Sequence, residues 1–302
     1  MQALIPPYLE KNDSIGIFAP SRGVTPGQMA PFISFIQKAG FKCITGKHLY
    51  GKSKQFSGTI AERRSDIQQL LLDHDVKAMF AARGGYGAAQ LLSRLDWEVI
   101  RDNPKWLVGF SDLTALHSAF GKYTESIHGV MPYSLVMDPP QSEMSFDKLL
   151  AVLRGEALHY SIQDHDFNFP GTVRAVLTGG NLSVLFSLAG TAYEPDYEGK
   201  ILFLEDLDEY LYHIDRMLLN FEQRGIFEKI SGLIVGGFSE MHDNDISFGK
   251  SAYEILAEKA SKYNIPSLFG FPAGHQKHNF PLIFGRLSTL RSEKGHCFLE
   301  MY

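Results

Sequence analysis

The chain has 302 residues, enough for two domains or one large domain. Hydrophobic residues make up 44% of the chain and charged residues 21%, which is ordinary for a globular protein with buried cores. The formal net charge of -5 gives no general basic field, so the composition argues against nucleic-acid and membrane partners.

Cysteine content and hydropathy indicate the compartment. The two cysteines, Cys43 and Cys297, lie far apart in the sequence and are too few for a disulfide framework. No uninterrupted apolar segment is long enough to cross a bilayer, and the N-terminal residues lack the basic region and apolar core of a secretory signal. We therefore expect a cytoplasmic location.

Short apolar runs alternate with helical patterns through the first half of the chain. This alternation predicts βαβ units and a parallel sheet covered on both faces. The strands are expected at 14–20, 76–82 and 106–110, and the helices at 26–39, 61–73 and from residue 88 through residue 95.

The sequence pattern changes between residues 138 and 172, where two prolines, mixed charge and weaker hydrophobic periodicity occur together. We therefore expect an N-terminal domain at 1–138, an interdomain region at 139–172 and a C-terminal domain at 173–302. Strand patterns in the last part are expected at 173–177, 200–204, 232–238 and 285–291, and helical patterns at 181–188, 212–223 and 251–263.

The stretch KWLVGFSDLTALHSAF, residues 105–120, passes from a buried strand to a helix through a serine, almost without a loop. In an open α/β sheet, ligands gather where strands end and helices begin, and the first N–H groups of the helix stabilise negative charge. Ser111 is therefore placed to act as a nucleophile, with the N–H of Asp112 as an oxyanion donor. Alternatively, Ser111 or Asp112 is only the N-cap of the next helix.

A glycine-rich turn, Arg83-Gly-Gly-Tyr-Gly87, ends an earlier strand. Glycines let a backbone approach a ligand closely and direct N–H groups at it. The turn lacks the spacing of a dinucleotide-binding or phosphate-binding loop. It is either a tight turn or the source of a second oxyanion donor, for which Gly85 is the preferred N–H.

A serine nucleophile needs a base, and the base needs an orienting partner. Among eleven histidines, His275 lies in a loop-like stretch between two apolar runs, with His278 as a local competitor. Glu205 ends an apolar strand, whereas the acidic residues that follow it, including Asp206, are expected to be solvated or to cap a helix.

At these residues the sequence resembles the LD-carboxypeptidase family of serine peptidases, which also includes the microcin-immunity peptidases. The resemblance covers nearly the whole chain and depends on six segments in the order of the family. These are Ala19-Pro-Ser-Arg22, Arg83-Gly-Gly-Tyr-Gly87, Gly109-Phe-Ser-Asp112, Thr178-Gly-Gly-Asn-Leu182, Leu202-Phe-Leu-Glu-Asp206, and Gly274-His275 followed by Asn279 and Gly285.

The resemblance implies a catalytic triad of Ser111, Glu205 and His275. It also implies an N-terminal Rossmann-like α/β domain that carries the serine and a C-terminal α/β domain that carries the other two residues. Members are typically homodimers, need no metal or other cofactor, and cut an amide between an L-configured centre and a D-amino acid. Their usual substrate is the murein tetrapeptide, from which terminal D-alanine is released during cell-wall recycling.

The chain departs from the family pattern after the histidine, because Ile283 stands where the family usually has proline. This departure concerns the shape of the pocket beside His275. A carboxypeptidase must also bind a free carboxylate, for which Arg22 and Arg83 are candidates; each is equally suited to a structural salt bridge.

The sequence leaves three alternative functions open. A microcin-immunity type of enzyme would use the same triad on an aminoacyl-nucleotide analogue, and a non-catalytic α/β protein would use the glycine turn to bind a small ligand. A metal hydrolase is the third, with potential ligands in the segments 242–245 and 275–278, neither of which matches a catalytic zinc signature.

Overall fold

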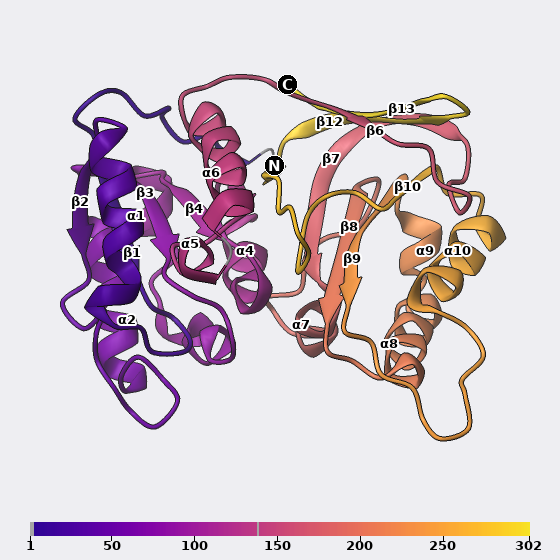
Figure 1. Ribbon diagram of the computed structural model, residues 1–302, viewed down its shortest axis with the longest axis horizontal. Coiled ribbons are helices and arrows are strands. Elements are labelled where there is room, and N and C mark those ends of the chain that lie inside the picture. Colours follow the sequence, from indigo (N-terminus) through magenta and orange to yellow (C-terminus); the bar gives the residue numbers. More distant parts are fainter. Residues whose placement is uncertain (1–2, 138) are drawn as a thin grey trace. The chain divides into compact units, whose positions relative to one another are not determined.

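The computed structural model describes residues 3–137 and 139–302, and it divides into two compact units (Figure 1). The first unit comprises Met1–Glu156 and Phe280–Ile283, and the second comprises Ala157–Asn279 and Phe284–Tyr302. The boundary expected at residue 138 lies outside the described residues. The region 139–172 holds a helix and a strand, and the chain passes between the units within it, after Glu156.

The first unit is built on a six-stranded sheet with the order β11-β5-β4-β3-β1-β2, in which the last five strands pair in parallel. Its strands are β1 (Ser14–Phe18), β2 (Lys42–Thr45), β3 (Val76–Ala81), β4 (Trp106–Gly109), β5 (Ser126–His128) and β11 (Leu282–Phe284). Its α-helices are α1 (Pro26–Lys38), α2 (Ile60–Leu72), α3 (Val99–Asp102), α4 (Thr114–Phe120), α5 (Ser134–Met137) and α6 (Pro139–Leu153), with two 3₁₀ helices, η1 (Ala88–Arg94) and η2 (Ser111–Leu113).

Aromatic side chains form much of the core of the first unit. Phe32 of α1 packs on Phe80 of β3 and on Phe146 of α6, with ring centroids 5.0 and 5.3 Å apart. Trp106, at the start of β4, is fully buried. Helix α1 therefore covers the sheet, and α6 packs against α1.

The second unit contains a seven-stranded sheet with the order β10-β9-β8-β7-β12-β13-β6. The first three pairings in this order are parallel, and the last three are antiparallel. Its strands are β6 (Leu158–Ile162), β7 (Gly171–Asn181), β8 (Ile201–Leu207), β9 (Gly232–Ser239), β10 (Ser267–Phe269), β12 (Leu287–Glu293) and β13 (His296–Met301). Its helices are α7 (Leu182–Ser187), α8 (Leu211–Gln223), α9 (Ile226–Lys229) and α10 (Ala252–Lys262).

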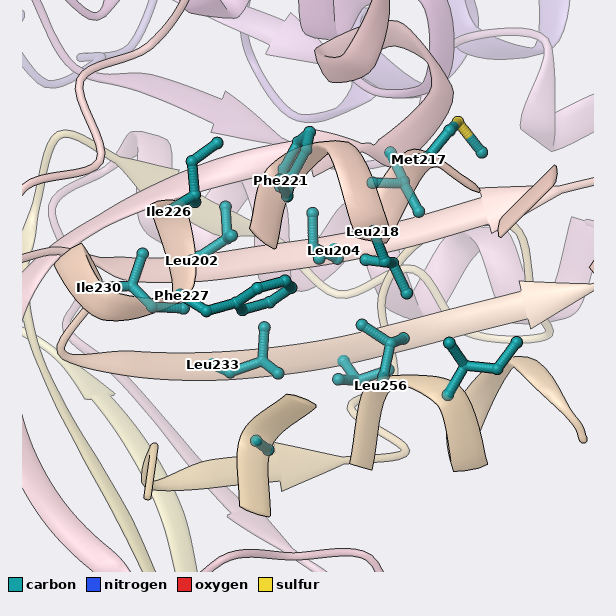
Figure 2. Packing of buried hydrophobic residues seen from close by; sticks show 14 of the residues in the cluster. Leu202, Leu204, Met217, Leu218, Phe221, Ile226, Phe227, Ile230, Leu233 and Leu256 are labelled. Carbon is teal, nitrogen blue, oxygen red and sulfur yellow. The ribbon is translucent and has the colours of Figure 1, made fainter. Parts of the chain in front are cut away.

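One face of the parallel part of this sheet packs against helices α7 to α10 (Figure 2). Alternate residues of a strand point to the same face, so Leu202 and Leu204 of β8 join Leu233 of β9 on the side of the helices. Phe221 of α8 and Leu256 of α10 face them from the helices. This layer fixes the direction of β8, the strand that carries Glu205.

Capping boxes begin three of the longer helices. The side chains of Thr25, Thr59 and Ser251 each accept a hydrogen bond from the backbone N–H of the third residue of the helix they precede, and the side-chain oxygen of that third residue accepts one from the backbone N–H of the cap. These pairs satisfy N–H groups that an α-helix leaves without a partner. The helices therefore begin where the sequence supplies a hydroxyl followed three residues later by Glu or Gln.

The expected fold class, two α/β domains of which the first is Rossmann-like with a parallel sheet, is confirmed. Within residues 3–137 and 139–302, we find no helix with the length and apolar character needed to cross a membrane.

The helix-facing core of the second unit gives a test of this packing. Phe221 is fully buried and packs against Tyr197 with ring centroids 5.9 Å apart, so Phe221→Ala leaves a cavity. We expect the free energy of unfolding to fall by about 3–5 kcal/mol. Leu219→Ala on the exposed side of the same helix is the control and should change it by less than about 1 kcal/mol. Urea unfolding measures both, and equal losses would contradict the assignment of the core face.

Candidate active site

Ser111 occupies a strained turn between β4 and α4. The backbone is extended at Phe110 and then takes a left-handed conformation at Ser111, where φ is 63°. A non-glycine residue in this region costs about 1–3 kcal/mol, and such residues cluster at functional sites. The helix α4 starts only after Leu113, so neither Ser111 nor Asp112 is its N-cap and the cap interpretation is wrong. The turn resembles the strained strand-to-helix turn that presents a nucleophilic serine.

The glycine turn after β3 approaches Ser111 closely. A Cβ atom on Gly84 would lie 3.1 Å from both the Cβ and the Oγ of Ser111, so a larger residue would press on the serine. Gly85 has a φ of 120°, which only glycine adopts without strain. The structure thus brings the turn that carries the expected donor Gly85 next to the expected nucleophile.

The two candidate arginines lie on the same unit. The side chain of Arg22 is exposed and runs beside Gly85, with its Cγ 2.6 Å from where a Cβ of that glycine would be. The guanidinium of Arg83 stacks on Tyr133, 4.1 Å above the ring centroid. Arg22 therefore lies beside the turn that reaches Ser111, whereas Arg83 makes a cation–π contact.

In the second unit, Glu205 and His275 form a hydrogen-bonded pair. The Nδ1 of His275 lies 2.7 Å from the Oε2 of Glu205, and the backbone N–H of His275 donates to the same oxygen at 3.2 Å. Because a carboxylate oxygen accepts, Nδ1 carries the proton, and in the neutral ring Nε2 has the lone pair. Glu205 is fully buried and His275 is 17% exposed at its side chain. This tautomer is the one that a general base requires.

Local backbone geometry holds this pair together. The register of β8 against β9 shifts between Leu204 and Asp206, so Glu205 occupies an irregularity in the strand. Gly274 has a φ of 98°, and a Cβ there would lie 2.7 Å from the carboxylate, so only glycine fits before His275. The side chain of Asn279 accepts the N–H of Gly274 at 2.9 Å and closes the loop.

The pKa of His275 depends on two opposing causes. Burial of the imidazole lowers the pKa, but the carboxylate of Glu205, and more weakly those of Asp206 and Glu240, raise it, and the net direction is upward. The neutral base therefore predominates only at a higher pH than for an ordinary histidine.

Asp206 is buried, so of its two expected roles the solvated one is wrong, whereas it does bond an N–H in the first turn of a helix, as a capping group does. Its carboxylate accepts the side-chain amide of Asn181 at 2.8 Å and the N–H of Ser183 at 2.9 Å. Burial and the neighbouring charge of Glu205 raise the pKa of Asp206 to about 7. Asp206 thus fixes the end of β8 to the first turn of α7, directly beside Glu205.

The two segments expected to supply metal ligands place their histidines against different carboxylates. His242 contacts Asp208, with its Nε2 2.5 Å from the carboxylate, while His275 contacts Glu205. Among the described residues, no group of three or more His, Cys, Asp or Glu side chains is arranged to hold a metal ion.

Both halves of the chain match known domains. Residues 15–129 match the LD-carboxypeptidase N-terminal domain, and residues 174–290 match the LD-carboxypeptidase C-terminal domain. The solved structure of the muramoyltetrapeptide carboxypeptidase from Oxalobacter formigenes is 30% identical, covers 95% of this chain and 98% of its own, and has a TM-score of 0.86. The chain belongs to the LD-carboxypeptidase family.

Two curated relatives indicate the range of this family. The probable murein peptide carboxypeptidase of Bacillus subtilis is 29% identical over 311 residues, with 98% of this chain and 94% of the relative covered. The microcin C7 self-immunity protein MccF of Escherichia coli is also 29% identical, with 97% and 95% covered. The chain is thus a peptidase of the LD-carboxypeptidase family whose relatives include murein peptide carboxypeptidases and MccF.

Ile283, which departs from the family pattern, lies in β11 at the edge of the sheet of the first unit and is 2% exposed. Proline is found in sheets mainly on edge strands. The substitution therefore falls on a buried strand position of the LD-carboxypeptidase fold.

His117 supports the serine turn and was not singled out from the sequence. Its Nε2 lies 2.9 Å from the carbonyl oxygen of Gly109, and its Nδ1 lies 2.9 Å from the hydroxyl of Ser126. A carbonyl only accepts, so Nε2 carries the proton. Burial lowers the pKa of His117 to about 4. A histidine inside a helix gives no signal in the sequence that it fixes the strand before the serine.

Acid unfolding tests the role of His117. The folded-state pKa of His117 lies below the value of about 6.5 for an unfolded chain. The contribution of this group to the free energy of unfolding is therefore fully present above pH 6.5 and is lost as the pH falls to about 4. This group contributes a loss of up to about 3 kcal/mol. In His117→Gln, the free energy of unfolding measured by urea at each pH should fall less over this window. The exposed His159→Gln is the control and should keep the full loss; identical pH dependence in the His117 variant would refute the assignment.

Proposed function

We propose that this family member is a serine LD-carboxypeptidase that releases terminal D-alanine from murein tetrapeptide during cell-wall recycling in the cytoplasm, and that it acts as a homodimer. The observation that carries the proposal is the buried hydrogen bond between Glu205 and His275, in the tautomer that a catalytic base needs. The strained turn at Ser111 supplies the matching nucleophile.

In this mechanism, Ser111 Oγ attacks the carbonyl carbon next to the terminal D-residue, and His275 Nε2 takes its proton. Glu205 keeps the proton on Nδ1 and stabilises the imidazolium that forms. The C–N bond then breaks as His275 returns a proton to the leaving amine of D-alanine. Water attacks the acyl-enzyme by the same route and frees Ser111.

The oxyanion of each tetrahedral intermediate is assigned to the N–H groups of Asp112 and Gly85. Preorganised donors of this kind each contribute about 10²–10³ in rate in comparable enzymes. The close approach of Gly84 to Ser111 supports this choice of turn.

The proposed pairing of Ser111 with His275 follows the triad that the family resemblance implies. The segment that carries His275 continues into β11, which belongs to the same sheet as β4, the strand that leads to Ser111.

Substrate recognition is assigned to the exposed Arg22, which can meet the free carboxylate of the peptide. Arg83 is the second candidate, although its guanidinium is engaged with Tyr133. An arginine pairs with a carboxylate through two parallel hydrogen bonds, which adds both energy and orientation.

The alternative within the family is an enzyme that cleaves aminoacyl-nucleotide analogues. It is favoured by the similarity to MccF and uses the same three residues. A non-catalytic binding protein would tolerate loss of Ser111. The Ser111 variant tests that possibility, and the comparison of substrates described last separates the two enzymes.

The triad predicts that Ser111→Ala and His275→Gln each lower kcat for release of D-alanine by about 10³-fold or more. The matched controls are Ser118→Ala, which removes another hydroxyl from the same helix region, and His278→Gln. Both controls should stay within about threefold of the parent, as measured by chromatography of released D-alanine. Near-normal turnover in Ser111→Ala would refute the assignment of the nucleophile.

Glu205→Gln adds a pH readout to the same series. Removing the carboxylate removes the main cause that raises the pKa of His275, so the acid limb of kcat/KM should move to lower pH while the rate falls. Glu209→Gln, which leaves the pair intact, should not move it. An unchanged acid limb in Glu205→Gln would mean that a group other than Glu205 orients His275.

Carboxylate recognition predicts that tetrapeptide ending in free D-alanine is cleaved, and that the same peptide with an amidated terminus is cleaved at least about tenfold less efficiently. Arg22→Gln should reduce this preference by raising KM for the free acid, while Arg83→Gln serves as the comparison. Efficient cleavage of an aminoacyl sulfamoyl nucleoside with none of the tetrapeptide would instead favour the alternative substrate. A preference unchanged in Arg22→Gln but lost in Arg83→Gln would transfer the role to Arg83.

A further inference from the structure

One buried carboxylate connects three loops of the first unit. Strands β4, β3 and β1 are neighbours in the sheet, and their carboxyl ends lead to Asp112, the glycine turn and Ser21 respectively. Asp112 is 5% exposed, and its Oδ2 accepts the hydroxyl of Ser21 at 2.5 Å and the N–H of Ala88 at 2.9 Å. The residue after the expected nucleophile is thus bonded to both neighbouring loops through a single oxygen atom.

A buried cation holds the same two loops from helix α2. Arg63 is 2% exposed, and its Nη1 donates to the carbonyls of Pro20 at 2.5 Å and Gly87 at 3.1 Å. Its Nη2 donates to the side chain of Gln90 at 2.7 Å. A Cβ on Gly87 would lie 2.6 Å from the guanidinium, so glycine is needed there for the arginine to reach the turn.

The two buried charges balance one another. Burial raises the pKa of Asp112, while the hydrogen bonds from Ser21 and Ala88 and the charge of Arg63 oppose this rise. Burial lowers the pKa of Arg63, and the charge of Asp112 opposes it. A buried charge without its partner is strongly unfavourable, so each residue makes the other acceptable in this site. A carboxylate this close to a developing oxyanion would also oppose it unless a cation compensated the charge.

We infer that the side chain of Asp112, with its charge balanced by Arg63, is a positioning group that holds the glycine turn against the Ser111 turn. The backbone N–H of Asp112 and that of Gly85, the proposed oxyanion donors, lie on the two segments that this carboxylate joins. A misplacement of about 1 Å at such a site costs about 10²-fold in rate. The inference depends on the proposed role of Ser111 as the nucleophile.

Asp112→Ala and Asp112→Asn distinguish positioning from charge. Because both hydrogen bonds go to one oxygen, the amide oxygen of asparagine can accept both, whereas alanine accepts neither. For D-alanine release from murein tetrapeptide, Asp112→Ala should lower kcat by about 10²-fold with KM within about threefold. Asp112→Asn should keep kcat within about tenfold of the parent. A kcat for Asp112→Ala within about threefold of the parent would overturn the inference.

The charge balance is tested by a double-mutant cycle. Arg63→Gln alone leaves the carboxylate uncompensated and should lower kcat, and adding Asp112→Asn should restore kcat by at least about fivefold. Two independent, multiplicative losses would contradict the proposed balance. Asp66→Ala removes another buried carboxylate of the same unit, bonded to the N–H of His48, and should leave kcat unchanged. An equal loss of kcat in Asp66→Ala would mean that the effect is only structural.

Ser21→Ala provides a milder variant if Asp112→Ala does not fold. It removes one of the two hydrogen bonds and should lower kcat by about five- to tenfold. Ser57→Ala, whose hydroxyl bonds to the carbonyl of Ala19 and not to Asp112, is its control. Equal kcat for the two variants would overturn the inference. If Ser111→Ala is inactive while these variants are normal, only the positioning role fails; if Ser111→Ala is active, the proposed function fails.

Discussion

Parallel strands bring their carboxyl ends to one edge of a sheet, and this constraint determines where both units place the candidate site residues. In the first unit, the loops after β1, β3 and β4 meet around Asp112. In the second unit, Glu205 lies near the end of β8, Asn181 ends the adjacent β7, and His275 follows β10. Residues far apart in the sequence become neighbours in each unit because the strands before them are neighbours in a sheet.

Each unit then keeps a buried carboxylate at this edge and gives it specific partners. Glu205 accepts two hydrogen bonds from His275, and Asp112 accepts one from Ser21 and one from Ala88. Burying such groups is unfavourable unless they are paired, so the partners are as necessary as the carboxylates. The same hydrogen bonds also fix the orientation of each carboxylate, because a buried carboxylate that rotated away would lose them.

The sequence predicted the parts of this arrangement that depend on local pattern. Ser111 at a strand-to-helix turn and Glu205 on an apolar strand follow from the alternation of strands and helices. The choice of His275 over His278 came from the loop context and the family resemblance, whereas the hydrogen bond to Glu205 is visible only in the fold. No pattern in the sequence indicates the role of Arg63, because an arginine in a helix rich in charged residues is expected to face solvent, and its contact with the glycine turn exists only in the fold.

Several strands, including β5 and β11, each of three residues, have no sequence pattern that predicts them. So short a run has no readable period, and its pairing is decided by the neighbouring strand rather than by its own residues. Missing β11 matters for the proposed site, because β11 follows the segment that carries His275 and belongs to the sheet of the first unit. Local sequence pattern therefore predicts the longer strands and helices, whereas the pairing of strands distant in the sequence decides which loops lie close together.

The strained conformation of Ser111 shows what these contacts maintain. A left-handed serine is unfavourable by about 1–3 kcal/mol and persists only where its surroundings allow no alternative. The chain before it is held by His117 on the carbonyl of Gly109, and the chain after it is held by the carboxylate of Asp112. With both sides fixed, relaxing Ser111 would break buried hydrogen bonds worth more than the strain. The left-handed conformation of the half-buried Ser111 is therefore maintained by polar groups on either side of it.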